Sequence, residues 1–470
     1  MSLNRLRYAD NGTMGQHSSV AGGCGSMIRR EFTIAEGTIL FISAYVLSAG
    51  LGIIRQALFN AEFGTGMEAS AYYAAFRLPD TIASLISGGA LSNAMIPVLL
   101  GVRHEEGDTA ERRLVNLAAT TLTAAVTLIV LICIVFAPFL VRFVIAPGFD
   151  SAAAALTVAL TRIMLAQLIL VVISSVAIAV LNARNQFLLT AISIVTHNIT
   201  MIGGILAARF IPGVGIYGPT CGVVGDALLQ LVILWIGLRA NRFRLRPVWG
   251  LRDAQLRRML RLLTPNGLSS GVNYAGGIVD TAFASLAREP GALPTLFNAG
   301  LLMGVPLRLI GVALAQAAFP RIAASAARGD WARMRKTLGA ALAISIILAI
   351  GAALMLALTG RSLIRLLFER GRFDAAAGDL TSLLLIVYIA GLPAYVATEV
   401  LTRGLIALHD SQTPLVTNCA QLMGRIALIW VWLEPWGVVA IPAAFALTSA
   451  LETLTLGMAL RWRMRANVEG

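Results

Sequence analysis

Charged residues, cysteines and histidines are scarce in this chain, and each shortage excludes a class of protein. Only 13% of the 470 residues are charged, about half the share in an ordinary soluble domain. The four cysteines form no metal-type pair and the four histidines are scattered, so the sequence predicts no metal site. No nucleophile lies beside a candidate base. The sequence therefore indicates neither an enzyme nor a bound cofactor.

Apolar residues are abundant instead. They make up 57% of the chain and recur from residue 34 onwards in runs of about 20 residues, long enough to cross a ~30 Å hydrocarbon core as a helix. A transmembrane barrel would show short alternating strands. The sequence predicts an all-α polytopic membrane protein with about twelve transmembrane helices, at residues 34–59, 70–100, 114–145, 153–181, 187–209, 217–239, 260–286, 294–320, 337–358, 379–405, 414–433 and 437–461.

Basic residues are distributed unevenly over the predicted loops. With the N-terminus inside, about 25 of the 37 Lys and Arg residues face the cytoplasm and about seven face the opposite side. The positive-inside rule then places both termini in the cytoplasm, in a bacterial cytoplasmic membrane. This distribution explains the net charge of +13 without nucleic acid, as topology plus attraction to anionic lipid. One exception, "RSLIRLLFERGRF" at residues 361–373, is interpreted as an amphipathic segment lying on the outer surface.

A short motif occurs twice. "GGALSNAMIP" at residues 88–97 returns as "GVALAQAAFP" at residues 311–320, which predicts two six-helix lobes of the same orientation. Lobes of this kind are related by a pseudo-two-fold axis along the membrane normal, an architecture typical of alternating-access transporters. The predicted divisions are a disordered cytoplasmic tail at 1–33, an N-terminal lobe at 34–239, an Arg-rich cytoplasmic linker at 240–259, a C-terminal lobe at 260–461 and a cytoplasmic tail at 462–470.

Polar and charged residues inside the apolar runs are the candidate site residues, because a charge at bilayer depth is expensive. Ser92 and Asn93 lie in the first repeat, where they either contact substrate or make a packing hydrogen bond. Arg55, Arg77 and Arg308 are candidates for substrate binding, with a structural ion pair or snorkelling to the interface as the alternative.

Two aspartates are candidates for coupling to a cation, since carboxylate oxygens suit a hard cation. Asp280 lies in the middle of the seventh predicted helix, and a packing hydrogen bond is the alternative for it. Asp410 lies beside "SQTP", where the alternative is a helix N-cap.

Several motifs together resemble the MurJ (MviN) family of lipid II flippases, within the multidrug/oligosaccharidyl-lipid/polysaccharide exporter superfamily. The resemblance runs over residues 37–460 and implies outward flipping of a lipid-linked cell-wall precursor by alternating access. It implies membrane lipid and a lipid-linked oligosaccharide as partners, and coupling to membrane potential, Na⁺ or H⁺. The oligomeric state is not indicated. The matching motifs are Phe63-Gly64, "FRLP" at 76–79, the run ending at Pro97, "APGF" at 146–149, "VDTAFAS" at 279–285, "GVALAQAAFPRIA" at 311–323 and "HDSQTP" at 409–414.

The chain also departs from the family pattern at several positions where relatives carry charge. Two further C-terminal helices of the family are not among the 470 residues. We interpret Arg308 as a replacement for the lost arginine of the eighth helix. The departures leave two alternatives to lipid II flipping open: export of another lipid-linked glycan or amphiphile, and a non-transporting membrane scaffold. The uncharged positions are Ala49, Ser70, Ala83, Ser84, Gly88, Gly300, Leu301 and Gly304.

Overall fold

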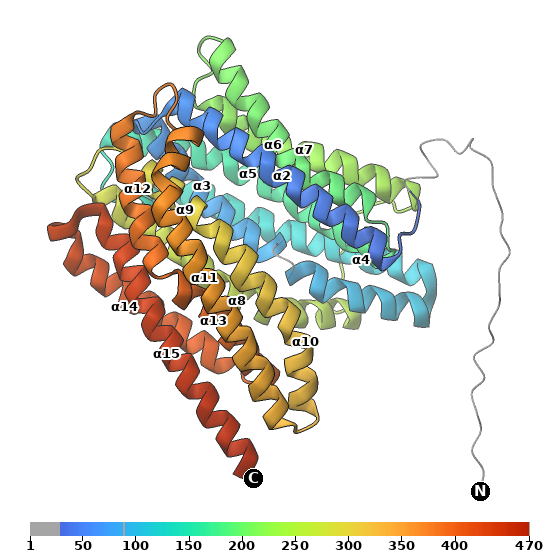
Figure 1. Ribbon diagram of the computed structural model, residues 1–470. Coiled ribbons are helices and arrows are strands. Elements are labelled where there is room, and N and C mark those ends of the chain that lie inside the picture. The colour runs from blue at the N-terminus through green and yellow to red at the C-terminus, as the bar shows by residue number, and fades with distance from the viewer. Residues whose placement is uncertain (1–28, 88–89, 470) are drawn as a thin grey trace, which may run out of the picture.

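The computed structural model describes residues 29–87 and 90–469, without the side chains of residues 34, 86, 87, 90, 93, 264–273 and 466–469. Every regular element in these ranges is a helix (Figure 1), which confirms the predicted all-α class. The first half contains α2 (Ile34–Phe63), α3 (Met67–Ser87), α4 (Ala90–Leu140), the π-helix η1 (Val141–Ile145), α5 (Ser151–Ala183), α6 (Leu188–Phe210) and α7 (Tyr217–Ala240). The second half contains α8 (Ala254–Leu286), α9 (Ala292–Pro306), the π-helix η2 (Leu307–Val312), α10 (Ala313–Ala327), α11 (Trp331–Leu367), α12 (Ala375–Ala390), α13 (Leu392–Ala407), α14 (Gln412–Trp436), the 3₁₀-helix η3 (Gly437–Val439) and α15 (Ala440–Glu469).

Each of the twelve predicted segments coincides with helix. By length and apolar character alone, the described chain holds eight stretches able to span a membrane, or nine if the pair α12–α13, bent by 44°, counts as one. Two of the eight stretches each join two predicted segments. One of them includes α4, whose backbone is not helical at Gly107 (φ 83°). A multi-pass membrane protein is therefore confirmed, whereas the number twelve stays a prediction.

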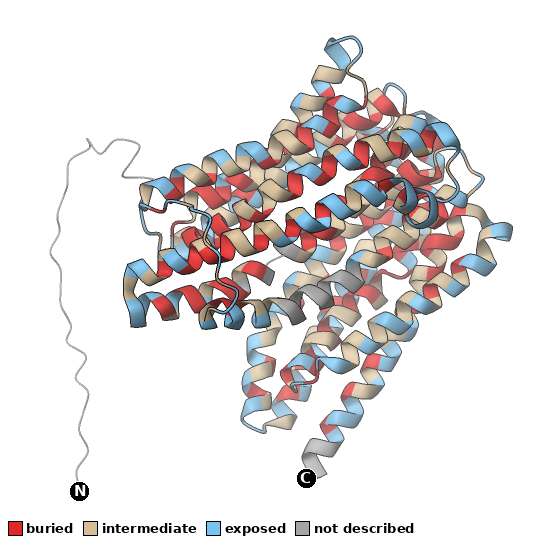
Figure 2. Cartoon of the chain, turned by 180° about the vertical axis from the view of Figure 1, so that it is seen from behind, coloured by how far each residue is buried: buried red, intermediate tan, exposed pale blue. Residues whose placement is uncertain are grey.

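The helices form two bundles that spread apart from a common end (Figure 1). One bundle consists of α2–α7 and the other of α9–α15, while α8 packs against α3 and α4 of the first bundle and α14 of the second. Buried residues lie where helices face one another, and exposed residues follow the outer faces (Figure 2). Large apolar side chains such as Leu358 (83% exposed) and Trp430 (72% exposed) stand on these outer faces. Exposed apolar surface of this extent is what a bilayer covers.

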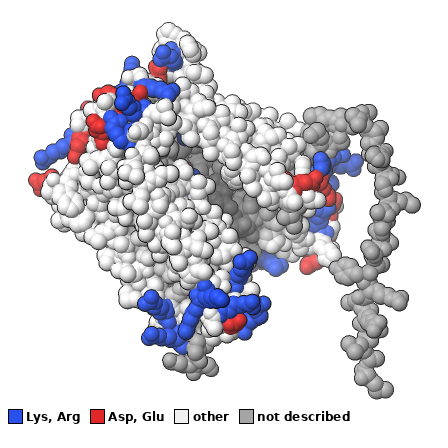
Figure 3. Space-filling model, viewed as in Figure 1, with Lys and Arg blue, Asp and Glu red and all other residues white. Residues whose placement is uncertain are grey.

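The two bundles are joined by direct contacts at the end that we call the sealed end. There the Arg372 backbone N–H donates to the Ala61 carbonyl at 2.9 Å, and the Gly148 N–H donates to Ser285 Oγ at 3.1 Å. Gly371 has φ +59°, and a Cβ at this position would overlap the Ala61 backbone. At the opposite end, the open end, the molecule is hollowed between the bundles (Figure 3). We call this hollow the cleft.

The segment 361–373 differs from the prediction of a surface-lying amphipathic helix. Helix α11 continues through it to Leu367, and Phe368 and Phe373 are each only 1% exposed. Arg361 forms ion pairs with Glu369 and Asp379. The alternation of arginines and apolar residues therefore reflects a helix end packed at the sealed end, with Arg361 paired to two carboxylates.

The predicted domain limits are close to helix ends in the structure. Helix α2 begins directly after Thr33, which forms a capping box with Glu36. The predicted linker falls between the end of α7 at Ala240 and the start of α8 at Ala254. The predicted tail before residue 34 lies almost entirely outside the described residues. The lobe boundaries and the pseudo-two-fold axis stay predictions.

Candidate functional site in the cleft

Arg55 belongs to a chain of hydrogen bonds that joins three helices of the first bundle. Its Nη1 lies 3.0 Å from His197 Nε2 on α6, and His197 Nδ1 lies 3.0 Å from Asp226 Oδ2 on α7. Because a guanidinium only donates, Nε2 accepts and Nδ1 carries the proton donated to Asp226. Thr196 Oγ1 donates to the second oxygen of Asp226 at 2.9 Å. The aspartate therefore orients the imidazole, and the imidazole orients Arg55.

Arg77 connects the two bundles. From α3 it donates through Nε to Thr281 Oγ1 on α8 at 2.8 Å, and its Cζ lies 5.6 Å from the centre of the Phe297 ring on α9. Asp80 follows one turn later on α3. Arg77, His197 and Arg308 all lie within electrostatic reach of the Asp80 carboxylate, and they come from three different helices.

Arg308 is exposed and lies in the π-helix η2, directly after Pro306. Arg77 and Arg308 both act electrostatically on Asp80, and Arg55 is bonded to His197, which acts on Asp80 as well. We call this group of residues the cleft cluster. The group contains three arginines and two carboxylates, so it keeps a positive surplus even with a neutral histidine. Arginine suits a phosphate ligand because its planar fork is bidentate and always charged. The cleft cluster consists of Arg55, Arg77, Asp80, His197, Asp226 and Arg308.

Of the six members of the cleft cluster, only the arginines were predicted as site residues. Asp226 is recognisable in the sequence as a charge in an apolar helix, whereas Asp80 and His197 were missed. Asp80 directly follows the proline of "RLPD", and His197 is the one ionisable residue of α6 before Arg209. Both were visible as polar residues in apolar helices, but their partners lie on other helices. Of the two predicted small contacts, Ser92 is half-buried on α4, and the side chain of Asn93 lies outside the described residues. A substrate contact by either stays a prediction.

Asp280 forms an ion pair with Arg425 of α14. Arg425 is 5% exposed, and its Cζ lies 4.3 Å from the centre of the Phe445 ring. A buried pair with this geometry neutralises itself and adds no net charge to the cleft. The predicted role of Asp280 in ion coupling stays a prediction, with its carboxylate engaged by an arginine in this conformation.

Asp410 caps the start of α14. Its oxygens accept hydrogen bonds from the Thr413 N–H at 3.0 Å and from Arg463 Nε at 2.9 Å. Burial by itself raises the pKa of Asp410, but the bonds from Thr413 and Arg463 outweigh it and hold the pKa below its ordinary value. Asp280 and Asp410 share no partner, and no group of three or more His, Cys, Asp or Glu residues in the described chain is placed to hold a metal ion. A joint cation site thus stays a prediction.

A buried amide network closes the cleft toward the sealed end. Gln56 Nε2 donates to Tyr73 OH at 2.6 Å and to Asn298 Oδ1 at 2.9 Å, and Asn60 Nδ2 donates to the same Asn298 oxygen at 3.1 Å. Asn60 and Asn298 are 0% exposed. The Tyr73 and Phe297 rings stack at 4.3 Å. Since α2 and α3 belong to one bundle and α9 to the other, these bonds hold the bundles together.

Two of the uncharged positions on α9 stand beside empty space. A Cβ added at Gly300 or at Gly304 would meet no atom of the described part of the chain within 4 Å. The helix therefore has room for larger side chains there, and the glycines are not required by close packing.

Comparisons with known proteins agree with this architecture. A family model described as "Lipid II flippase MurJ" matches residues 59–468. The chain is 28% identical over 423 residues to "Probable lipid II flippase MurJ" of Rhizobium meliloti, which covers 88% of this chain and 78% of that protein. It is 27% identical over 432 residues to "Lipid II flippase MurJ" of Burkholderia cenocepacia, with 90% and 83% covered.

Solved structures of low sequence identity share the fold. A lipid II flippase MurJ in an inward closed conformation has a TM-score of 0.78 at 22% identity, covering 90% of this chain and 87% of that chain. A multidrug resistance MATE family transporter of the MOP superfamily, in an inward-facing conformation, has a TM-score of 0.75 at 13% identity, covering 92% and 99%. Because the family model spans most of its length, the chain belongs to the lipid II flippase MurJ family, a family of membrane transporters and not of enzymes.

Proposed function

We propose that this chain moves a lipid II-like precursor, a glycan linked to a lipid by pyrophosphate, from the inner to the outer leaflet of the bacterial cytoplasmic membrane by alternating access. Membership of the MurJ family supports the class of cargo. The observation that carries the proposal is the cleft cluster, because it combines arginines from both bundles around the Asp80 carboxylate and His197. A pyrophosphate held there would be released when the bundles separate at the sealed end.

Within the cluster the arginines have different roles. Arg308 is exposed and forms no ion pair within the described ranges, so it meets the incoming phosphate first. Arg77 already bridges the bundles through Thr281, so a phosphate that displaces this bond would loosen the contact between α3 and α8. Arg55 is held by His197 and acts as a fixed positive charge behind them.

The charge distribution supports a cytoplasmic open end. Lys and Arg side chains gather at the tips of both bundles on either side of the hollow (Figure 3). The turn between α10 and α11 and the linker after α7 contribute to these tips. By the positive-inside rule this end faces the cytoplasm. Both termini then lie in the cytoplasm, and the structure corresponds to the state that loads cargo from the inner leaflet.

Complementation of a bacterial strain depleted of its own lipid II flippase tests the proposal. The full chain should restore growth, and Arg77→Gln should abolish the rescue at equal membrane abundance, because it removes a charge and the bridge to Thr281. Arg308→Gln should weaken the rescue. Arg335→Gln on the exposed start of α11 is the matched control and should rescue fully. Failure of the unmodified chain despite stable expression would overturn the proposed cargo.

One observation favours a second candidate, export of a different lipid-linked glycan. At Gly300 and Gly304 the family pattern has charge, and here both positions are uncharged with open space beside them, so α9 carries fewer charges than that pattern implies. Transport into vesicles of lipid II should be compared with transport of a lipid-linked sugar bearing one phosphate. A preference for the single phosphate would favour this candidate, whereas transport of neither would leave a scaffold as the better explanation.

A further inference from the structure

The Arg-rich linker is not a loose connection between the bundles. Its extended part, residues 243–250, lies along α4, and we call it the strap. The Arg246 N–H donates to Asn116 Oδ1 at 3.2 Å, and the Val248 N–H donates to Thr120 Oγ1 at 3.0 Å. Gly250 lies against Leu117, where a Cβ would approach the leucine to 2.9 Å. Residues 116, 117 and 120 lie on one face of the helix, so the strap has a defined path along it.

The strap begins with an anchored aromatic side chain. Phe243 is 3% exposed, and the Cζ atoms of Arg184 and Arg112 lie 4.8 Å and 5.9 Å from its ring centre. Arg184 is neutralised by Glu111, whose carboxylate lies 2.5 Å away. Arg112 forms no such pair in the described chain, and its Nε is buried without a hydrogen-bond partner. Arg184 Nε is likewise buried without a partner, so two donors beside the ring are left unsatisfied, a costly condition that a ligand would relieve.

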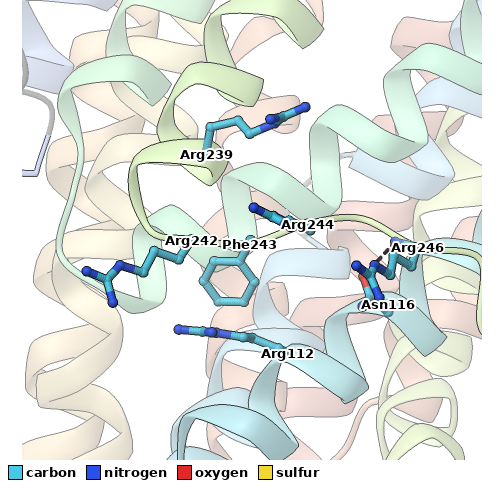
Figure 4. A pocket seen from close by; sticks show the side chains of 7 residues that line it. All are labelled: Arg112, Asn116, Arg239, Arg242, Phe243, Arg244 and Arg246. Atoms are coloured by element: carbon cyan, nitrogen blue, oxygen red, sulfur yellow. Dashed lines mark hydrogen bonds between the residues drawn. The ribbon is translucent and has the colours of Figure 1, made fainter.

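Arginines surround this anchor in Figure 4 and line a pocket of about 620 Å³. A neighbouring cavity of about 300 Å³ continues it past Trp235 and Leu245. None of the five pocket arginines forms a salt bridge within the described ranges. The pocket thus concentrates five uncompensated charges, and it is built from elements of the first bundle and the strap. Its lining residues are Arg112, Asn116, Arg239, Arg242, Phe243, Arg244 and Arg246.

We propose that this pocket binds the phosphate-bearing headgroup of an anionic phospholipid. Guanidinium groups recognise phosphate oxygens in pairs, and each basic side chain near a membrane surface strengthens the attraction to anionic lipid. The surroundings favour a lipid over a free phosphate. Arg239 lies over the Trp235 ring, and Trp249 in the strap and Leu251 just after it are 68% and 61% exposed. Tryptophan at such a position is typical of the membrane interface.

A binding measurement on the full chain in detergent tests this proposal independently of transport. Fluorescent phosphatidylglycerol in mixed micelles should bind, and phosphatidylcholine should not compete with it. Arg244→Gln/Arg246→Gln should weaken binding roughly 30-fold, the effect expected from two lost charges at the membrane surface. The double variant keeps the Arg246 backbone bond to Asn116, so the strap should stay in place.

Arg333→Gln/Arg335→Gln at the start of α11 removes the same charge from the other bundle and is the matched control. It should leave binding within about two-fold of the unmodified chain. Equal weakening by both pairs would overturn the proposal in favour of general surface attraction. Full displacement of the lipid by millimolar inorganic phosphate or pyrophosphate would also overturn it, since it would identify a soluble phosphate as the ligand.

Discussion

The two ends of the molecule are closed in different ways, and the difference shows how such a transporter changes state. At the sealed end the bundles meet through backbone atoms and buried amides, with Gly371 against Ala61 and Asn298 between Gln56 and Asn60. At the open end basic side chains stand apart on both tips (Figure 3). Short contacts between buried groups hold one end, while basic side chains on both tips add repulsion at the other. The balance between these ends sets how often the sealed end opens.

The largest effect is expected from Gly371→Val. The left-handed backbone disfavours a β-branched residue and the new side chain overlaps Ala61, for a cost of about 2–5 kcal/mol in the sealed conformation. The measurement uses a chain whose own four cysteines are replaced by serine and whose fully buried Thr295 is replaced by cysteine. A thiol-reactive reagent should modify this cysteine at least ten-fold faster with Gly371→Val than without it.

Gly329→Val is the matched control for this comparison. Gly329 also has a positive φ, +68°, but lies in the turn before α11 with no atom within 4 Å of an added Cβ. Gly329→Val should carry only the cost of placing a β-branched residue in a left-handed backbone. The rate of labelling of the Thr295→Cys reporter should not change. Equal acceleration by both variants would show that the contact with Ala61 does not hold the sealed end.

A smaller effect is expected from Asn298→Leu. It leaves the buried amides of Gln56 and Asn60 without their shared acceptor, at about 1–3 kcal/mol, or roughly 5- to 150-fold in the balance between sealed and opened states. Modification of the same cysteine reporter measures this shift. Gln421→Leu removes an amide that bonds Thr448 within one bundle, and it should lower the Tm without exposing the reporter. Faster labelling of the reporter in Gln421→Leu would show that amides between the bundles and amides within one bundle do not differ in their effect on the sealed end.

The smallest effect is expected at the open end, from Asp410→Asn. The loss of a charged cap should lower the free energy of unfolding by about 1 kcal/mol at neutral pH. Because the folded pKa of Asp410 lies below its ordinary value, its contribution is present above about pH 4 and is lost as the pH falls through the folded pKa. The Tm difference between the two chains should be constant from pH 8 to 5 and narrow below. Labelling of the Thr295→Cys reporter at the sealed end should not change.

The sequence predicts the local features well, because they depend on neighbouring residues. The apolar runs locate the helices, and the arginines stand out as charges in apolar helices. The partners of these charges depend on packing between helices. His197 lies 142 positions from Arg55, and no local pattern joins them.

Two interpretations from the sequence show where such reasoning fails. Amphipathicity in residues 361–373 does not distinguish a membrane surface from a contact between bundles, and the structure shows the contact. The Arg-rich linker is recognisable as positive charge, but its pocket depends on Asn116 and Thr120, which lie 130 and 128 positions from the strap amides they bind. Composition therefore predicts that the site is positively charged but not the shape of its pocket.

The π-helix η2 has a consequence for the phase of the helix that contains it. A π-turn holds one residue more than an α-turn, and one residue corresponds to about 100° of rotation. The extra residue at Leu307–Val312 therefore rotates the side chains of α10 about the helix axis relative to those of α9. Asn298 on α9 points to Gln56 while α10 packs on α11 and α13. Deleting one residue of η2 would make the helix more regular, but it would turn Asn298 away from its partners or α10 away from its neighbours.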